Sequence, residues 1–239
     1  MVSSAVKKYA ALCMVCLCSS LFFLGLYQFN NKYSQNTIQA ANGILALSEE
    51  ELQKSPVRFL VSGWAFYPDA LLTPEEIRDE SHYMRYLSIG EQTNFSSPAN
   101  PSPYGCGTYQ MTFFLPERKE TYALEIPEVF SAYNLYLDHD LILQMGEPAQ
   151  GTPLVQNRMV TFYGGKPVTL TIAVSNYDHF YGGIVYPPAF GTMLAVNTTR
   201  GIRFAFCLFS CTVTFVCALL SFYFSRRMKQ KNTFLFGLI

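Results

Sequence analysis

The chain has 239 residues, with 17 Lys and Arg against 17 Asp and Glu, and half of its residues are hydrophobic. This even balance gives no sign of a basic nucleic-acid-binding surface, so no nucleic-acid partner is expected. The charges are nevertheless segregated, because every Asp and Glu lies within Glu49–Asp178 and the charged residues outside this range are all basic. A soluble protein has no reason to sort its charges in this way, whereas a membrane protein does.

The first predicted element is an uncharged apolar stretch, Tyr9–Phe29, which follows Lys7-Lys8. About 21 residues at 1.5 Å each cross a hydrocarbon core of about 30 Å, which predicts a membrane-spanning helix. The alternative is a cleaved signal peptide. The apolar core is long for a signal peptide, and the nearest small-residue site, Ile38–Gly43, lies well past it. An uncleaved anchor over residues 1–29 is therefore the favoured interpretation.

Residues 30–200 are expected to form one extracytoplasmic domain, and their dominant signal is apolar–polar alternation with a period of two. In Val168–Asn176, for example, the residues at 168, 170, 172 and 174 are apolar and share one face. Such strands bury one face and expose the other, as in antiparallel sheets. Further strands are predicted at Arg58–Ala65, Met84–Ile89, Tyr109–Leu115, Tyr122–Ile126, Ala132–Leu137, Leu141–Met145, Met159–Tyr163 and Ile184–Val196. This number and spacing of strands predicts a mainly β fold, an antiparallel β-sandwich.

Helix is predicted at only two places in this domain. In "LTPEEI", Thr73 is expected as N-cap, Pro74 as the first helical residue and Glu76 as the partner in a capping box. The segment "LSEEELQ", Leu47–Gln53, predicts one further helical turn.

The triplet Asp138-His139-Asp140 lies between two apolar runs, Ala132–Leu137 and Leu141–Met145. Acid, histidine and acid side by side would suit a metal site, a proton relay or a turn. A metal site needs further ligands that converge from elsewhere in the chain, and the sequence offers no Cys/His zinc spacing. Asp is favoured in turns because its side chain bonds nearby backbone groups. A hairpin turn is therefore predicted, with no metal ion and no cofactor.

Two segments are candidate ligand-binding sites. The stronger is "NYDHFYGG", with Asn176, Tyr177, Asp178, His179 and Tyr181 ahead of a Gly-Gly turn, because aromatic faces beside hydrogen-bonding groups suit sugars and other polar ligands. The alternative is that the aromatic residues hold the loop in place while the histidine bonds the backbone. The weaker candidate comprises Trp64, Tyr67 and Asp69, although a single Trp at a strand end is usually part of a core.

A second apolar stretch, Phe204–Phe224, predicts a transmembrane helix over residues 201–225, and Arg226, Arg227, Lys229 and Lys231 follow it. With basic residues at the outer ends of both spans, the positive-inside rule places both termini in the cytoplasm and residues 30–200 outside, in a multi-pass protein of the cell membrane. Six of the seven cysteines lie in the apolar spans, so the outer domain holds no internal disulfide.

No group of residues in the sequence points to catalysis. His82, His139 and His179 lie in different segments, and neither Gly-x-Ser-x-Gly nor His-Glu-x-x-His occurs. Carboxylates for glycoside hydrolysis must face one another across a cleft, which a sequence does not reveal. The chain is therefore expected not to be an enzyme and to have no catalytic residues.

Four segments, "VSGWAFYPDALLTPEE", "YGCGTYQMTFFLPE", "YALEIPEVFSAYNLYLDHDLILQMG" and "TIAVSNYDHFYGGIVYPPAFGT", together resemble one bacterial family. They are similar to the extracytoplasmic domain of seven-transmembrane receptors with diverse intracellular signalling modules. The likeness runs from about Gly43 to Ile239, and its most specific parts are Gly63–Tyr67, Ser131–Gly146 and Ser175–Gly191. It implies a jelly roll similar to the galactose-binding domains of sugar-processing enzymes, flanked by transmembrane helices.

The resemblance continues into "SRRMKQKNTFLFGLI", which is similar to the basic loop after the first helix of the family's membrane bundle. Residues 226–239 would then be this loop and the start of a further helix, and the chain would be a fragment or a truncated product. The output module, outside this chain, would be a histidine kinase or a nucleotide cyclase.

Three functions are left open by the sequence. The first is a sensor input that binds an external small molecule, with carbohydrate as the leading class, and passes the event to the helix from Phe204. The second is a surface carbohydrate-binding module, and the third is an accessory domain of a membrane-bound sugar hydrolase. The expected partners are the ligand, the membrane and a second copy of the chain as a homodimer.

Overall fold

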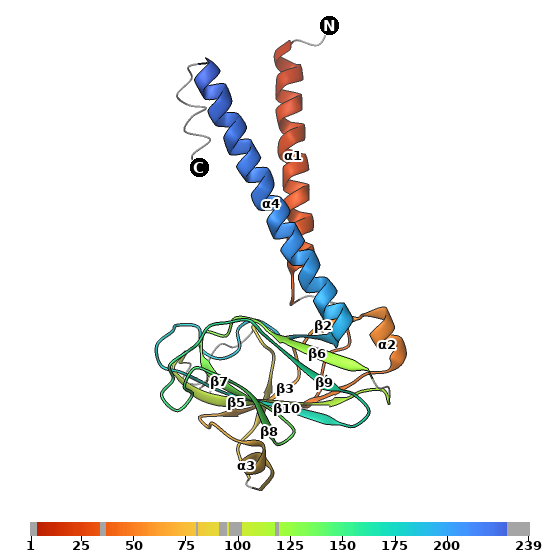
Figure 1. Ribbon diagram of the computed structural model, residues 1–239, viewed down its shortest axis with the longest axis vertical. Helices are drawn as coiled ribbons and strands as arrows, with labels where there is room; N and C mark the ends of the chain where they lie inside the picture. Colours follow the sequence, from red (N-terminus) through yellow and green to blue (C-terminus); the bar gives the residue numbers. More distant parts are fainter. Residues whose placement is uncertain are drawn as a thin grey trace.

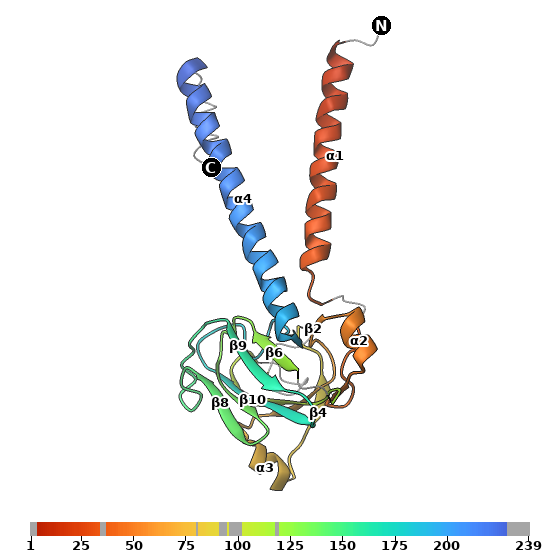
Figure 2. The same ribbon diagram turned by 45° about the vertical axis from the view of Figure 1, so that its right-hand side comes forward.

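The computed structural model describes residues 4–33, 37–79, 81–90, 95, 102–117 and 120–228. These residues form a domain of two β-sheets and two long helices, α1 (Ser4–Asn30) and α4 (Met193–Met228). Both helices extend away from the same side of the domain (Figures 1 and 2). The expected basic loop and further helix after Met228 lie outside the described residues. Both described helix ends remote from the domain therefore lie on one side, as the predicted topology requires.

The two sheets form a β-sandwich. The larger sheet has the order β4-β3-β5-β10-β7-β8, with β1 added to β5, and comprises β1 (Ile44–Ala46), β3 (Trp64–Pro68), β4 (Arg85–Leu87), β5 (Gly105–Phe114), β7 (Ala132–Leu137), β8 (Asp140–Met145) and β10 (Val168–Asn176). The smaller has the order β2-β11-β6-β9 and comprises β2 (Val57–Phe59), β6 (Thr121–Ile126), β9 (Arg158–Tyr163) and β11 (Ala189–Thr192). Every pairing is antiparallel except β1 with β5. The predicted mainly β, antiparallel fold is confirmed, while its assignment to the jelly-roll class remains a prediction.

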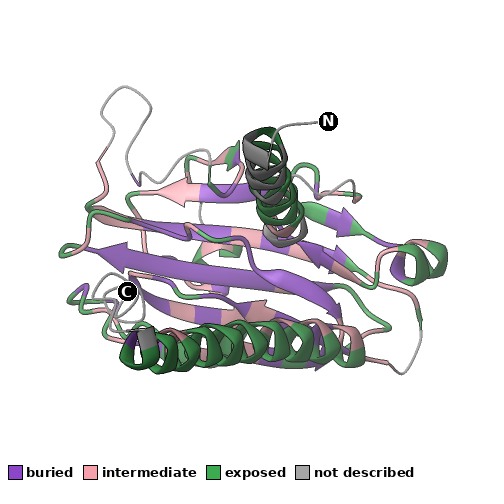
Figure 3. Cartoon of the chain, turned by 90° about the horizontal axis from the view of Figure 1, so that it is seen from above, coloured by how far each residue is buried: buried purple, intermediate pink, exposed green. Residues whose placement is uncertain are grey.

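The core lies between the sheets and follows the predicted alternation. Strand β10 lies between β5 and β7 and buries the residues at 168, 170, 172 and 174, which pack with Met111 and Phe113 of β5. Phe190 of β11 stacks on Phe113 at 4.9 Å between ring centroids and on Tyr122 of β6 at 5.7 Å, so aromatic rings join the two sheets. Seen from the side of the helices, the buried residues gather in the strands, whereas α4 is exposed over most of its length (Figure 3). Burial of these side chains is the main driving force for the fold.

Two of the predicted strands are wrong in part. Arg58–Ala65 is split into β2 and β3, which belong to different sheets, because the chain turns at Gly63, whose φ is +82°. In the range Ile184–Val196 only Ala189–Thr192 is strand, and the helix α4 begins at Met193, eleven residues before the apolar run. The alternating apolar residues there misled the prediction, since Val196 is buried from a helix rather than from a strand.

Both predicted short helices are confirmed, the one at Thr73 with its predicted capping box and the other with a capping box that was not predicted. Helix α2 (Glu49–Lys54) begins at the N-cap Ser48, whose hydroxyl accepts a hydrogen bond from the Glu51 N–H. The buried guanidinium of Arg58 donates to the carbonyls of Glu51 and Ser55 at 3.1 Å and so satisfies the end of α2. Burial lowers the pKa of Arg58.

One helix of the described residues is long and apolar enough to cross a membrane: α4, over Met193–Arg227, with mean hydropathy 2.2 and no part of its most apolar window buried. The described side chains of α1 hold a shorter apolar segment, Cys16–Gln28. The expected pair of membrane spans is thus supported for α4 alone, and a multi-pass chain is not supported.

Candidate functional site

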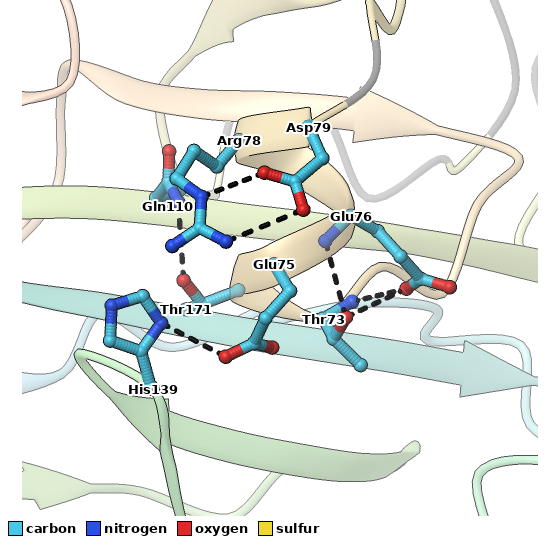
Figure 4. A network of polar contacts seen from close by, with 8 residues as sticks. All are labelled: Thr73, Glu75, Glu76, Arg78, Asp79, Gln110, His139 and Thr171. Atoms are coloured by element: carbon cyan, nitrogen blue, oxygen red, sulfur yellow. Dashed lines mark hydrogen bonds and ion pairs between the residues drawn. The ribbon is translucent and has the colours of Figure 1, made fainter.

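A polar groove lies on the outer face of the large sheet, on the side of the sandwich remote from α1 and α4. Helix α3 (Pro74–Asp79) covers it and strands β5 and β10 form its floor (Figures 1 and 4). Its volume is about 530 Å³, within the range of small-molecule sites. We call it the α3 groove; its lining residues are Pro74, Ile77, Arg78, Gln110, Thr112, Asp138, His139, Lys166, Pro167 and Thr169.

The capping box holds α3 over the sheet. The Thr73 N–H donates to the Glu76 carboxylate at 2.7 Å, and the Glu76 N–H donates to the Thr73 hydroxyl at 3.4 Å. The Glu76 carboxylate accepts hydrogen bonds from the backbone N–H and from the hydroxyl of Thr73, and these bonds lower its pKa. The bond from the backbone has the larger effect. The segment that leads to α3 is fixed to β5, where the buried Thr108 hydroxyl donates to Ala70 and accepts from Leu72.

The floor of the groove consists of the outward side chains of two neighbouring strands. Gln110 of β5 donates to the Thr171 hydroxyl of β10 at 3.3 Å, and the hydroxyls of Thr112 and Thr169 lie 3.1 Å apart. These residues are the polar half of the alternation whose apolar half forms the core. Thr171 is buried, whereas Gln110, Thr112 and Thr169 are partly exposed and line the groove. The contact between Thr112 and Thr169 is long for two hydroxyls, so a ligand hydroxyl can replace it at small cost.

The rim of the groove carries three charge pairs. His139 Nδ1 lies 2.9 Å from Glu75 Oε1, Arg78 Nε lies 2.7 Å from Asp79 Oδ1, and Lys166 Nζ lies 3.6 Å from Asp138 Oδ2 (the first two in Figure 4). Most of these side chains are more than one third exposed, so the pairs contribute little to stability. Together with the floor, these pairs offer donors and acceptors to a hydroxyl-rich ligand.

The Asp138-His139 pair forms the turn between β7 and β8, as predicted. Asp138 has φ +55°, its N–H donates to the Thr169 carbonyl at 2.7 Å, and its carboxylate accepts from the Thr169 N–H at 2.9 Å. Sequence reasoning missed that the same turn lines a groove, because Glu75 is 64 positions away in the sequence. Among the residues the structure describes, no three His, Cys, Asp or Glu side chains are grouped to hold a metal ion.

The predicted site at 176–181 lies at the opposite end of β10 from this groove and is largely occupied with structural contacts. Asn176 is buried, its amide donates to the carbonyls of Pro103 at 2.8 Å and of His179, and its oxygen accepts from the His179 N–H. Tyr177 covers Gly151, where any larger residue would collide with the ring. Asp178 is exposed. Both amide N–H groups of Asn176 are thus used by backbone carbonyls, and the side chain is not accessible to a ligand.

The rings of this loop form a cluster. His179 stacks on Phe130 at 4.7 Å and on Phe180 at 5.0 Å, and its Nδ1 accepts from the Tyr181 N–H at 3.1 Å. The histidine bonds backbone, as the structural alternative expected. Phe180 remains 63% exposed.

The weaker predicted site separates into three structural roles. Trp64 is fully buried, donates from its indole N–H to Leu60 and lies edge-on to Tyr109, so it is a core residue. Asp69 is an exposed turn residue with φ +57°. Tyr67 is partly buried beside His82. Its pKa is raised mainly by burial and to a smaller extent by the neighbouring Tyr86. Strand β5 separates this segment from the loop at 176–181.

No protein-family model matches the chain, and no curated protein matches it. Similar solved structures include a β-glucuronidase of Faecalibacterium prausnitzii (16% identity, TM-score 0.43, 58% of this chain and 32% of that one). A glycosyl hydrolase family 2 member of Bacteroides cellulosilyticus shows 11% identity and TM-score 0.46 over 57% of this chain and 20% of that one. A putative β-galactosidase from Bacteroides fragilis shows 15% identity and TM-score 0.40 over 57% and 23%. The chain thus matches less than one third of each.

The expectation that the chain is not an enzyme is contradicted by these comparisons, because the similar structures are glycoside hydrolases. That expectation relied on the absence of short motifs. Glycosidase carboxylates come from distant segments and are recognised by their separation across a cleft, so missing motifs do not exclude them. At such low identity the likeness concerns the fold, and no activity of these proteins is transferred to the chain. None of the comparisons concerns the seven-transmembrane receptors.

Proposed function

We propose that the domain is a membrane-anchored, extracytoplasmic carbohydrate-binding module, of the galactose-binding-like jelly-roll type, that takes its ligand in the α3 groove. The observation that carries this proposal is the convergence of hydroxyl, amide and paired charged groups over a cavity on the side remote from the membrane helices. Such a site serves either a surface-binding protein or the accessory domain of a membrane-bound sugar-processing system. Helix α4 supplies the anchor, and α1 is a second one in this proposal.

The test is calorimetric titration of the full chain, held in lipid nanodiscs, with galactose, glucose, galacturonate and glucuronate. At least one sugar is expected to bind, and Gln110→Ala is expected to weaken its binding about five- to tenfold, since one hydrogen bond contributes about 1 kcal/mol. Gln156→Ala, a change at an exposed residue outside the groove, is the matched control and should leave the affinity unchanged. Absence of binding at millimolar concentrations, or equal effects of both variants, would contradict the proposal.

A second candidate, the input domain of a seven-transmembrane receptor, has one specific observation in its favour. Helix α4 begins at Met193 directly after the last strand residue, Thr192, and packs against β11, β6 and β2. With no linker between them, a ligand that favours one arrangement of the sandwich would also bias the orientation of α4.

This second function is tested by spin-label distances between Tyr9 of α1 and Phe224 of α4, measured with and without a bound sugar. A receptor predicts a change of distance on saturation, whereas a passive binding module predicts none. The reading frame after Ile239 provides an independent check. Further apolar spans with a kinase or cyclase domain favour the receptor, a stop codon favours the surface module, and a hydrolase domain favours the accessory role.

A further inference from the structure

A second cavity, of about 740 Å³, lies where the two long helices meet the domain. We call it the junction pocket. Its walls come from the end of α1 and the residues after it, from the third and fourth turns of α4 and from the domain loop that contains Tyr186 (the helices are seen in Figures 1 and 2). The pocket shares no residue with the α3 groove, which lies on the other side of the sandwich.

Two cations converge in this pocket on one aromatic ring. Lys32 Nζ lies 5.9 Å and the Arg203 guanidinium carbon 5.1 Å from the ring centre of the buried Phe59. Lys32 also lies 5.8 Å from the Tyr186 ring centre. Cation–π contacts hold both charges in place, but they do not neutralise them.

The charges of the pocket are not compensated by a salt bridge. The salt bridges of the described residues include neither Lys32 nor Arg203. Burial lowers the pKa of Lys32 most, and the positive charge of Arg203 lowers it further. The negative charges of Glu128 and Glu125 raise this pKa, but by less. Arg203 Nε is buried and has no hydrogen-bond partner among the described residues. Two partly buried like charges and a buried, unpaired N–H both cost free energy, which an anion between them would recover.

The other walls of the pocket are apolar and belong to the membrane helices. Leu26 and Tyr27 are in the last turns of α1, and Phe206 follows Arg203 by one turn of α4. The apolar run of α4 starts at Phe204, directly after the arginine, and that of α1 ends at Phe29, three residues before the lysine. Both cations thus mark the level at which apolar helix surface gives way to the polar domain, so an occupant there needs an anionic head and an apolar tail.

We propose that the junction pocket binds one anionic phospholipid of the outer leaflet, with its phosphate between Lys32 and Arg203 and an acyl chain along Leu26 and Phe206. The Arg203 guanidinium suits a phosphate because its fork of N–H groups can donate two parallel bonds. A headgroup with net negative charge, such as phosphatidylglycerol, is selected over phosphatidylcholine, whose choline cation would meet two further cations. This inference rests on the membrane anchoring proposed above and is independent of sugar binding.

The experiment uses the full chain in vesicles of phosphatidylcholine that contain spin-labelled phosphatidylglycerol or spin-labelled phosphatidylcholine. The fraction of immobilised label gives the relative affinity for the two lipids. Wild-type protein is expected to prefer phosphatidylglycerol, and Lys32→Gln and Arg203→Gln are each expected to lower this preference about fivefold. Arg200→Gln removes an exposed charge of the same helix that does not line the pocket, and should change it less than about twofold.

Three results would overturn the proposal: no preference in the wild type, an equal effect of Arg200→Gln, or displacement of the labelled lipid by inorganic phosphate alone. The last would indicate an anion site without a lipid tail. Arg203→Lys keeps the charge and loses the forked geometry, so an intermediate preference supports the assignment even if Arg203→Gln fails to fold. Flotation of the vesicles reports membrane insertion separately, and sugar titration reports the α3 groove, so a failure of either is not confused with loss of lipid selectivity.

Discussion

The loop Asn176–Gly183 and the α3 groove are both polar regions at opposite ends of strand β10, but their side chains are used differently. In the loop, the buried Asn176 bonds backbone carbonyls and an N–H, and Ser131 accepts from the Gly183 N–H. In the groove, the partly exposed Thr112 and Thr169 bond each other, and the partly exposed Gln110 bonds the buried Thr171. Buried side chains that bond to the backbone stabilise the fold, whereas partly exposed side chains that bond to each other can exchange these partners for a ligand. Changes in the loop should therefore affect stability, and changes in the groove should affect binding.

The largest expected effect concerns the two buried tyrosines of the core, one of which, Tyr109, lies directly beneath the loop at Gly183. Burial raises the pKa of Tyr109 and of Tyr133 from 10.0 to about 12. Because the folded pKa is raised, the contribution to stability is complete below pH 10 and is lost as the pH rises to about 12. Each tyrosine is expected to contribute about 3 kcal/mol.

Denaturant unfolding of the full chain at a series of alkaline pH values measures this loss. The double variant Tyr109→Phe, Tyr133→Phe cannot ionise at these positions and should lose much less stability between pH 10 and 12. An unchanged pH dependence in the double variant would show that other groups cause the alkaline instability.

The second largest effect is expected for Asn176→Ala, which leaves the Pro103 carbonyl and the His179 backbone groups without their buried partner. The free energy of unfolding should fall by about 2–3 kcal/mol. Asn157→Ala is the matched control, because Asn157 is exposed and its side chain bonds the Glu125 carboxylate at the surface; it should change stability by less than about 0.5 kcal/mol. Equal effects of the two changes, measured by thermal unfolding, would contradict a structural role for Asn176, and the loop would again be a candidate for ligand binding.

The comparison also explains what the sequence could and could not predict. The alternation in β10 and β5 identifies the core face correctly, because burial of every second side chain is a local property of a strand. The capping box at Thr73 is equally local and is found where expected, and a second one, at Ser48, follows the same rule. The break at Leu60–Gly63 was not predicted, since nothing in that short apolar run indicates that its two halves join different sheets.

The site was harder to predict than the fold for a related reason. "NYDHFYGG" has the composition of a ligand site because its polar and aromatic residues are adjacent in sequence, but adjacency of this kind is typical of a tightly packed turn. The α3 groove draws on α3, β5, the β7–β8 turn and the start of β10, and its residues are adjacent only after folding. Asp138 and His139 were noticed in the sequence, and their turn was predicted correctly, yet Glu75 and Gln110 carried no signal that would place them nearby.

A smaller effect on stability is expected for changes at Asp138, which has two roles, since it forms the β7–β8 turn and also lines the α3 groove. Asp138→Ala loses the bond to the Thr169 N–H and places alanine at φ +55°, which should cost about 1–2 kcal/mol of unfolding free energy. Asp138→Asn retains an oxygen acceptor and tolerates the left-handed conformation, so it should stay within about 0.5 kcal/mol of wild type. Thermal unfolding of both variants checks this, and similar losses in both would mean that the carboxylate charge, rather than the turn geometry, matters.

The smallest effect on stability, and the sharpest test of the comparison, is expected for His139→Ala. Its contact with Glu75 at 2.9 Å lies at the surface, where such pairs contribute a few tenths of a kcal/mol. The free energy of unfolding should therefore change by less than about 0.5 kcal/mol, while the affinity for a groove-bound sugar falls severalfold. Glu75→Gln and the double variant complete a mutant cycle that isolates the pair from the two single residues. If His139→Ala instead lowered stability as much as Asn176→Ala and left sugar affinity unchanged, the groove would be a structural region like the loop, and the distinction between them would fail.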